Sequence, residues 1–147
     1  MRFAWLTMFA LAAPCSVAMA QNALPMMQLR VGAHRIEVEI AATPRTRDRG
    51  LMHRTMFPAN RGMLFSFPGE QTYCMWMRNT TIPLSVAFID SRGVIVNTAE
   101  MPSGTDDYYC SEKPVRYALE MNRGWFRKKG VLPGTRIRNI SKVPPGQ

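Results

Sequence analysis

Short stretches in which apolar and polar residues alternate, separated by turn signals, recur along most of this chain. Residues 28–31 and 34–40 alternate in this way on either side of Gly32 and Ala33, which predicts a β-hairpin. Each alternating stretch has one apolar face, because successive side chains of a strand point to opposite sides. Many such faces must be buried together, so the pattern predicts a compact, mainly β, single-domain barrel or sandwich of short antiparallel strands.

Further strands are predicted from short apolar or alternating segments that are bounded by turn-forming residues. They cover residues 63–67, 73–77, 84–89, 94–96, 115–121 and 136–140. In the 84–89 segment, Leu84, Val86 and Phe88 share one face.

One or two short helices are expected outside the strands. Thr43 followed by Pro44 is typical of a helix start and predicts a short helix to about His53. Residues 124–129 predict one further helical turn. The polar residues 101–114 are rich in turn formers and favour a long surface loop.

The first twenty residues have the composition of an export signal. Arg2 is their one charged residue, and an apolar run over residues 3–13 follows it. Ala18 and Ala20 form the A-x-A pattern that precedes cleavage by signal peptidase. We therefore expect cleavage after Ala20 and release into the bacterial periplasm of a protein that is not integral to the membrane.

A retained membrane anchor is the main alternative, and it would need about twenty uninterrupted apolar residues. Pro14, Cys15 and Ser16 interrupt the apolar run well before that length. Lipid attachment at Cys15 is a third alternative, but Pro14 stands where lipoprotein processing favours a small residue.

Without the leader, 127 residues remain, which is the size of one domain. We divide them into a short linker at 21–26, a β-rich domain at 27–141 and a flexible tail at 142–147. The mature chain has 18 basic and 10 acidic residues, a net charge of +8 that is spread along the sequence. Anionic lipids and other acidic envelope groups are its natural counterparts, and the compartment excludes nucleic acid. We expect a monomer.

The cysteine count indicates a disulfide. Cys15 leaves with the leader, so Cys74 and Cys110 remain as a pair in an oxidising compartment. A bridge between them would add roughly 3–4 kcal/mol to stability by the chain-entropy estimate. Two separate thiols are the alternative.

Several local strings resemble a known family, domain of unknown function family 192 (uncharacterised protein family 0127), over about residues 27–141. They are Arg49-Gly50-Leu51-Met52, Gly62-Met63-Leu64-Phe65, Trp76-Met77-Arg78-Asn79-Thr80, Ile82-Pro83-Leu84, Phe88-Ile89-Asp90 and Ala118-Leu119-Glu120. The resemblance implies a compact, mostly β domain, frequently behind a signal peptide, with no established activity. It carries over no catalytic residue. The chain departs from the family at Ser85, where many members have an acidic residue.

The segment from Trp76 to Thr80 is the first candidate for a binding site. It places aromatic, basic and amide groups at the end of a strand, where a rigid scaffold can present them to a ligand. Trp76, Arg78, Asn79 and Thr80 are the candidate ligand-binding residues. The alternative is structural, with Asn79 and Thr80 bonding the backbone of a turn and Trp76 filling the core.

Two carboxylates, Asp90 and Glu120, are candidates for ligand binding or for acid–base chemistry near Asn79. A glycosidase-like reaction would need two carboxyl groups about 5 to 9 Å apart in one cleft. The structural alternatives are that Asp90 begins a turn and that Glu120 pairs with an arginine, Arg116 or Arg49. On the helix we expect Arg49 to pack inward toward Glu120.

Sulfur-containing side chains raise a copper hypothesis. Cys74, Met75 and Met77 are the soft ligands that Cu(I) prefers. Strand alternation, however, places Cys74 on the opposite face from the two methionines, and methionine is commonly a core residue. We therefore assign no metal ligands and no cofactor.

The mature chain contains no recognisable serine-hydrolase, zinc-protease, phosphate-loop or Cys-x-x-Cys motif. The leading interpretation is a non-catalytic, exported periplasmic binding or accessory domain for an unknown ligand or envelope component. The alternative is a small envelope-associated hydrolase that uses Asp90 or Glu120 near Asn79, and the minor alternative is a Cu(I)-binding protein.

Overall fold

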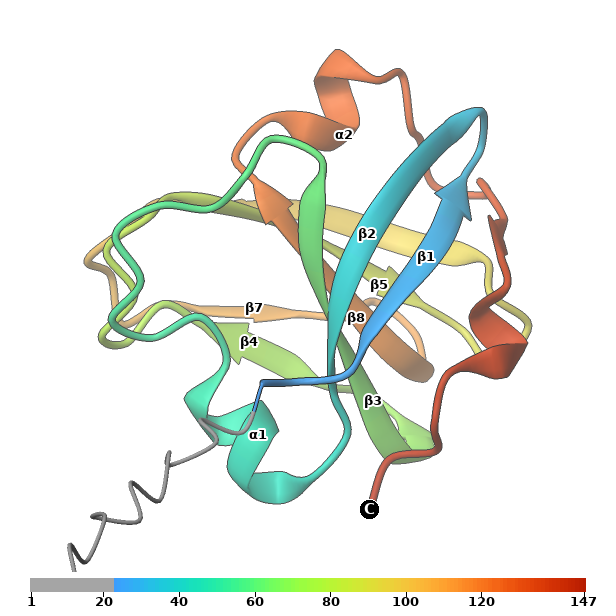
Figure 1. Cartoon of the computed structure of the whole chain (residues 1–147), viewed down its shortest axis with the longest axis horizontal. Helices are drawn as coiled ribbons and strands as arrows, with labels where there is room; N and C mark the ends of the chain where they lie inside the picture. Colours follow the sequence, from blue (N-terminus) through green and yellow to red (C-terminus); the bar gives the residue numbers. More distant parts are fainter. Residues whose placement is uncertain (1–22) are drawn as a thin grey trace, which may run out of the picture.

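The computed structural model describes residues 23–147, and the leader with its expected cleavage site lies outside these residues. Within the described residues, nine strands form a seven-stranded sheet in the order β6-β5-β8-β3-β2-β1-β9 and a two-stranded ribbon, β4-β7 (Figure 1). The strands are β1 (Met26–Val31), β2 (His34–Ala41), β3 (Arg61–Gln71), β4 (Cys74–Trp76), β5 (Leu84–Ile89), β6 (Ile95–Met101), β7 (Tyr108–Cys110), β8 (Val115–Asn122) and β9 (Ile137–Arg138). Three short helices accompany them, α1 (Pro44–Arg49), α2 (Trp125–Lys128) and the 3-10 helix η1 (Ile140–Lys142).

The large sheet is curled, and its two ends approach each other. At one end β9 pairs with β1, so that Ile137 lies opposite Val31. The same segment reaches the β5–β6 turn at the other end, where Ile137 N–H donates to the Gly93 carbonyl at 2.7 Å and Val94 bridges to Arg136. The prediction of a mainly β single domain with short helices is therefore confirmed.

One strand pair departs from the antiparallel pattern that the sequence predicts. The β1–β2 hairpin forms as expected, but β2 and β3 run parallel, with Glu37 opposite Arg61 and Ala41 opposite Phe65. A parallel pair needs a crossover of a dozen or more residues, and the segment between the two strands, which contains α1, provides it. This crossover carries α1 to the same end of the domain as the β4–β7 ribbon (Figure 1).

Apolar side chains form two clusters on the two faces of the sheet. Leu84, Val86 and Phe88 of β5 lie in one cluster, as their shared face predicts, while Ala87 and Ile89 lie in the other. The first cluster is packed beneath α1 and the ribbon. Among the described residues, no helix is long and apolar enough to cross a membrane.

Two local predictions need correction, and the last residues make contacts that bear on the predicted tail. Helix α1 ends at Arg49, four residues before His53, because Gly50 adopts a positive φ of 44° that closes the helix. The expected loop at 101–114 contains strand β7, which pairs with β4. The last residues do not extend away from the domain: Ser66 Oγ donates to the Pro144 carbonyl at 2.8 Å, and Gln147 N–H donates to the Ala42 carbonyl at 2.8 Å.

The inward-facing arginine of α1 is Arg47 and not Arg49, so that prediction was wrong. Arg49 is exposed and makes no ion pair within residues 23–147. The Arg47 guanidinium donates to the main-chain oxygens of Ala42, Ser66 and Gln147 at 2.7, 3.0 and 2.6 Å. The helix is shorter than expected, and Arg47 lies on the side of it that faces the domain.

Arg47→Ala should lower the free energy of unfolding by about 2–3 kcal/mol, because it leaves three main-chain oxygens without their donor. Arg49→Ala on the same helix should change it by less than about 0.5 kcal/mol, as is usual for an exposed side chain. Urea unfolding of the two variants measures the difference. Equal and small losses in the two variants would show that the Arg47 contacts contribute little to stability.

Candidate functional site

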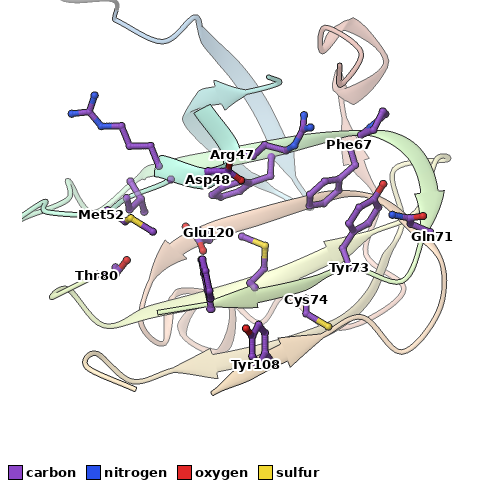
Figure 2. A pocket seen from close by; sticks show the side chains of 17 residues that line it. Arg47, Asp48, Met52, Phe67, Gln71, Tyr73, Cys74, Thr80, Tyr108 and Glu120 are labelled. Carbon is purple, nitrogen blue, oxygen red and sulfur yellow. The ribbon is translucent and has the colours of Figure 1, made fainter. Parts of the chain in front are cut away.

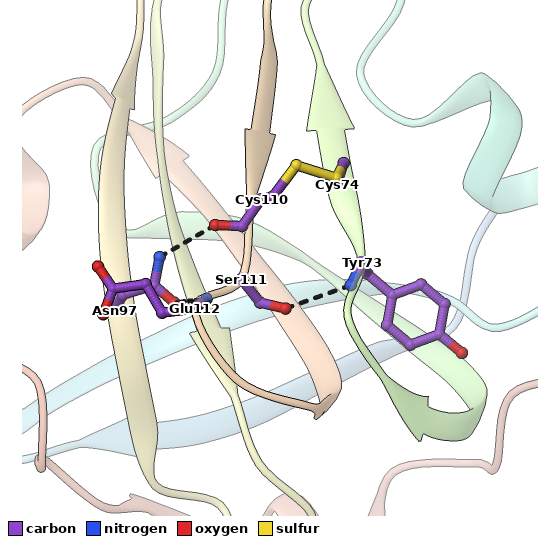
Figure 3. Close-up of a disulfide and its surroundings, with 6 residues drawn as sticks. All are labelled: Tyr73, Cys74, Asn97, Cys110, Ser111 and Glu112. Atoms are coloured by element: carbon purple, nitrogen blue, oxygen red, sulfur yellow. Dashed lines mark hydrogen bonds between the residues drawn. A yellow bond between two sulfur atoms is a disulfide. The ribbon is translucent and has the colours of Figure 1, made fainter.

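A disulfide fastens the two strands of the ribbon. Cys74 and Cys110 lie directly opposite each other in the β4–β7 register, with their Cα atoms 3.9 Å apart, and the predicted bridge is confirmed (Figure 3). The chain around it is held by further bonds: Tyr73 N–H donates to Ser111 Oγ at 3.2 Å, and Asn97 Nδ2 donates to the Cys110 carbonyl at 3.2 Å. Disulfides of this kind are typical of extracytoplasmic proteins.

A cavity of about 500 Å³ lies between α1, β3 and the ribbon. Its volume falls within the range of pockets that bind small organic molecules. Its walls combine charged and polar side chains with the aromatic and thioether side chains of Met52, Phe65, Phe67, Tyr73, Met75, Trp76 and Tyr108. In Figure 2, Met52 and Thr80 border it on one side, and Phe67 and Tyr73 border it on the other.

Glu120 places a carboxyl group inside this apolar cavity (Figure 2). It lies in the middle of β8, opposite Met63 of β3 and Val86 of β5, and only 3% of its surface is exposed. Within residues 23–147 no ion pair includes it, so neither of the expected partners, Arg49 and Arg116, is paired with it. Burial without a compensating charge raises the pKa of Glu120 to about 8.

Trp76 and Thr80, two of the candidates from the strand end, line the same cavity. Trp76 stacks across the ribbon against Tyr108, with ring centroids 6.0 Å apart. The Arg78 guanidinium covers the Trp76 ring at 4.2 Å and lies 3.8 Å from a carboxylate oxygen of Asp106. Thr80 is buried, and its hydroxyl donates to the Arg78 carbonyl at 3.3 Å.

Asn79 does not share this position. Its side chain is exposed, its φ is 55°, and its carbonyl accepts the His53 N–H at 2.9 Å. A short polar side chain tolerates this left-handed conformation better than most others do. The Asn79 backbone thus takes part in the turn, while Asn79 is absent from the lining of the cavity.

Asp90 lies at a different site, at the β5–β6 turn. Its carboxylate accepts the N–H groups of Arg92 and Val94 at 3.0 and 2.9 Å and pairs with the Arg92 guanidinium at 2.8 Å. Burial alone would raise the pKa of Asp90, but the hydrogen bonds from Val94 and Arg92 and the charge of Arg92 lower it below its usual value. Asp90 borders a separate hollow with Glu70 and Lys113, and so it does not form a carboxylate pair with Glu120.

The disulfide also bears on the copper hypothesis. Cys74 is bonded to Cys110 and offers no thiolate, while Met75 and Met77 are buried in the apolar cluster beneath the ribbon. Among residues 23–147, no three histidine, cysteine or acidic side chains are grouped as metal ligands would be. The soft-ligand set that the sequence suggested is therefore not assembled.

Sequence reasoning missed the part that α1 and β3 play in the cavity. The signal was present in two of the family-like strings, because Gly50, Leu51 and Met52 follow α1 into the cavity wall and Phe65 contributes from β3. Gly50 brings the helix end close to this wall: a Cβ there would lie 3.2 Å from the Phe65 ring. Tyr108 adds to the wall from β7, within the segment that was expected to be a surface loop.

The departure at Ser85 has a local explanation. Ser85 is fully buried, and its hydroxyl donates to Glu100 Oε1 of the neighbouring strand β6 at 2.9 Å. The Gly124 N–H donates to both Ser85 Oγ and Glu100 Oε2, at 2.7 and 3.1 Å. The Glu100 carboxylate of β6 thus accepts a hydrogen bond from the residue before α2.

Comparisons with known proteins agree with this architecture. The chain is similar to the crystal structure of a candidate transcription regulator from Sinorhizobium meliloti 1021, with 34% identity, a TM-score of 0.76, and coverage of 79% of this chain and 95% of that one. It is also similar to a protein of unknown function from Novosphingobium aromaticivorans DSM 12444, with 27% identity, a TM-score of 0.76, and coverage of 86% and 93%. No curated protein matches the chain significantly.

A family model covers most of the fold. The model of domain of unknown function family 192, described as "Uncharacterized ACR", matches residues 27–139. This range runs from β1 to the residue after β9 and includes α1, the ribbon and Glu120. The chain belongs to this family of uncharacterised proteins.

Proposed function

We propose that this protein is an exported binding domain that holds a small ligand with an apolar or aromatic body in the cavity beneath the β4–β7 ribbon. The observation that carries the proposal is the carboxyl group of Glu120, which is buried among apolar side chains and has no ion-pair partner within residues 23–147. A carboxyl group loses more hydration free energy on burial than an apolar side chain does. We therefore expect the carboxyl group of Glu120 to serve a ligand and not the stability of the sheet.

The arrangement of the walls supports a binding role. Trp76 and Tyr108 face the cavity from the two strands of the ribbon, and the disulfide fixes these strands to each other. Aromatic walls with a few polar groups are typical of small-molecule sites. A rigid wall also lowers the entropy that binding must overcome.

Catalysis by a pair of carboxylates is less well supported. Asp90 and Glu120 line separate hollows, and Asp90 is occupied by the N–H groups of its own turn. A hydrolase that uses both groups would need them in one cleft. We therefore favour a non-catalytic domain. The name of the Sinorhizobium protein mentions transcription regulation. That role would require nucleic acid, which an exported protein would not meet.

Export is part of the proposal and predicts where the mature chain begins. N-terminal sequencing of protein purified from the periplasm should start at Gln21, directly after the Ala20 cleavage site. A chain that still begins at Met1 in the membrane fraction would contradict both the cleavage and the compartment.

Ligand binding can be tested on residues 21–147 with a panel of arylalkyl alcohols, carboxylates and amines of graded length. We expect some members to shift the NMR resonances of the Trp76 indole N–H and the Thr80 amide, and to raise the melting temperature. Met52→Trp should fill the cavity and abolish these shifts. Met56→Trp is the matched control, since Met56 is 76% exposed and does not line the cavity. If no compound shifts these resonances, or if the shifts persist in Met52→Trp, the proposal is wrong.

A further inference from the structure

The entrance of the cavity carries more positive than negative charge. Arg47, Asp48 and Arg49 of α1 line it, and Arg49 has no acidic partner within residues 23–147. Arg78 places a guanidinium over the outer wall, where it stacks on Trp76 and is paired with Asp106. An uncompensated arginine beside an apolar cavity favours an anionic group on the molecule that enters it.

The interior of the cavity offers Glu120 no ion-pair partner among residues 23–147. The groups around Glu120 are the apolar Met63 and Val86 from the neighbouring strands, and the titratable Tyr73 and Tyr108 belong to the ribbon side of the wall. Arg47, Asp48 and Arg49 come from α1, and none of them forms an ion pair with Glu120. With a pKa of about 8, the carboxyl group is mostly protonated at neutral pH, and in that form its O–H can donate a hydrogen bond.

We infer, on the basis of the proposed function, that the ligand is an organic anion whose acidic group stays at the arginine-lined entrance while a carbonyl oxygen on its apolar body accepts a hydrogen bond from protonated Glu120. A cationic ligand would meet the arginines at the entrance and would require Glu120 to ionise in an apolar environment. Both steps oppose its binding. The cavity is thus expected to select the class of aryl or alkyl carboxylates that carry a carbonyl group along the chain.

The charge at the entrance can be tested with phenylbutyrate and phenylbutylamine, which share one body and differ in the sign of the charge. Calorimetry should show tighter binding of phenylbutyrate by about tenfold. Arg49→Glu should remove this preference. Arg45→Glu is the matched control, because Arg45 is exposed on the same helix and does not line the cavity. Tighter binding of the amine to the unaltered protein would overturn the inference while leaving the proposed function intact.

The role of Glu120 can be tested with benzoylpropionate, which is phenylbutyrate with one carbonyl group next to the ring. The extra hydrogen bond should tighten binding by roughly threefold to tenfold at pH 6. Above pH 8 this advantage should fall about tenfold per pH unit until it is lost, because ionised Glu120 no longer donates. Glu120→Gln, whose amide still donates, should keep the advantage at every pH. An advantage that grows with pH, or one that Glu120→Gln abolishes at pH 6, would contradict the inference.

Failure of the proposed function and failure of the assigned ligand class give different results. If carboxylates, amines and alcohols all fail to bind, the proposed ligand site itself is wrong. If they bind without the expected charge preference and without the expected pH dependence, the site stands and the assignment of its ligand class falls.

Discussion

Glu120→Gln should raise the free energy of unfolding, with the largest gain at pH 8 and above. Burial raises the pKa of Glu120 from 4.5 to about 8, so the folded protein holds this proton more tightly than the unfolded chain does. The resulting stability is fully present below pH 4.5 and is lost as the pH rises toward 8. A shift of this size corresponds to about 5 kcal/mol between the two ends of that range.

Urea unfolding of the two proteins from pH 4 to pH 9 measures this effect as a difference, in which the contributions of all other groups cancel. Glutamine stays neutral, so the difference should be small at pH 4 and should grow through neutral pH. Glu112→Gln is the control, since Glu112 is exposed and should show little effect at any pH. A difference that does not change with pH would mean that Glu120 ionises as freely in the folded protein as in the unfolded one.

Replacing Cys74 and Cys110 together with serine should lower the free energy of unfolding by about 4 kcal/mol. The bridge joins residues that are 36 positions apart, and constraining a loop of that size in the unfolded chain accounts for most of the effect. The two cysteines lie on strands of only three residues each, which have few other contacts to keep them paired. The loss should also free the wall that carries Trp76 and Tyr108.

Unfolding of the double variant, with and without reductant, measures the contribution of the bridge. Reductant should weaken the unaltered protein and leave the double variant unchanged. Ser103→Ala, an exposed change in the loop before β7, is the control and should have almost no effect. Equal stability of the double variant and the unaltered protein, or two free thiols in periplasmic protein, would contradict this account.

Local patterns in the sequence were sufficient to predict most strands. Alternation placed Leu84, Val86 and Phe88 on one face, and each is buried in the same cluster. The parallel pairing of β2 with β3 could not be predicted in this way, because alternation does not say which strands become neighbours. The length of α1 depended on Gly50, whose positive φ ends the helix at Arg49.

The candidate site could be predicted only in part, because the sequence does not say which elements become neighbours. Trp76, Thr80 and Glu120 surround one cavity, yet they come from β4, the turn after it and β8, which meet only in the folded chain. Asn79 and Asp90 are polar residues at turns as well, but the Asn79 carbonyl accepts the His53 N–H and the Asp90 carboxylate accepts the Val94 N–H. The sequence alone does not separate these two uses of a polar residue.

The carboxyl group of Glu120 can be observed directly by NMR, through the ¹³C shift of its Cδ atom during a pH titration. Our account predicts a midpoint near pH 8 in the free protein and a higher midpoint with benzoylpropionate bound, because the ligand accepts a hydrogen bond only from the protonated form. A midpoint near the ordinary value of 4.5, unchanged by the compound, would show that Glu120 is a solvated carboxylate and would contradict the central claim.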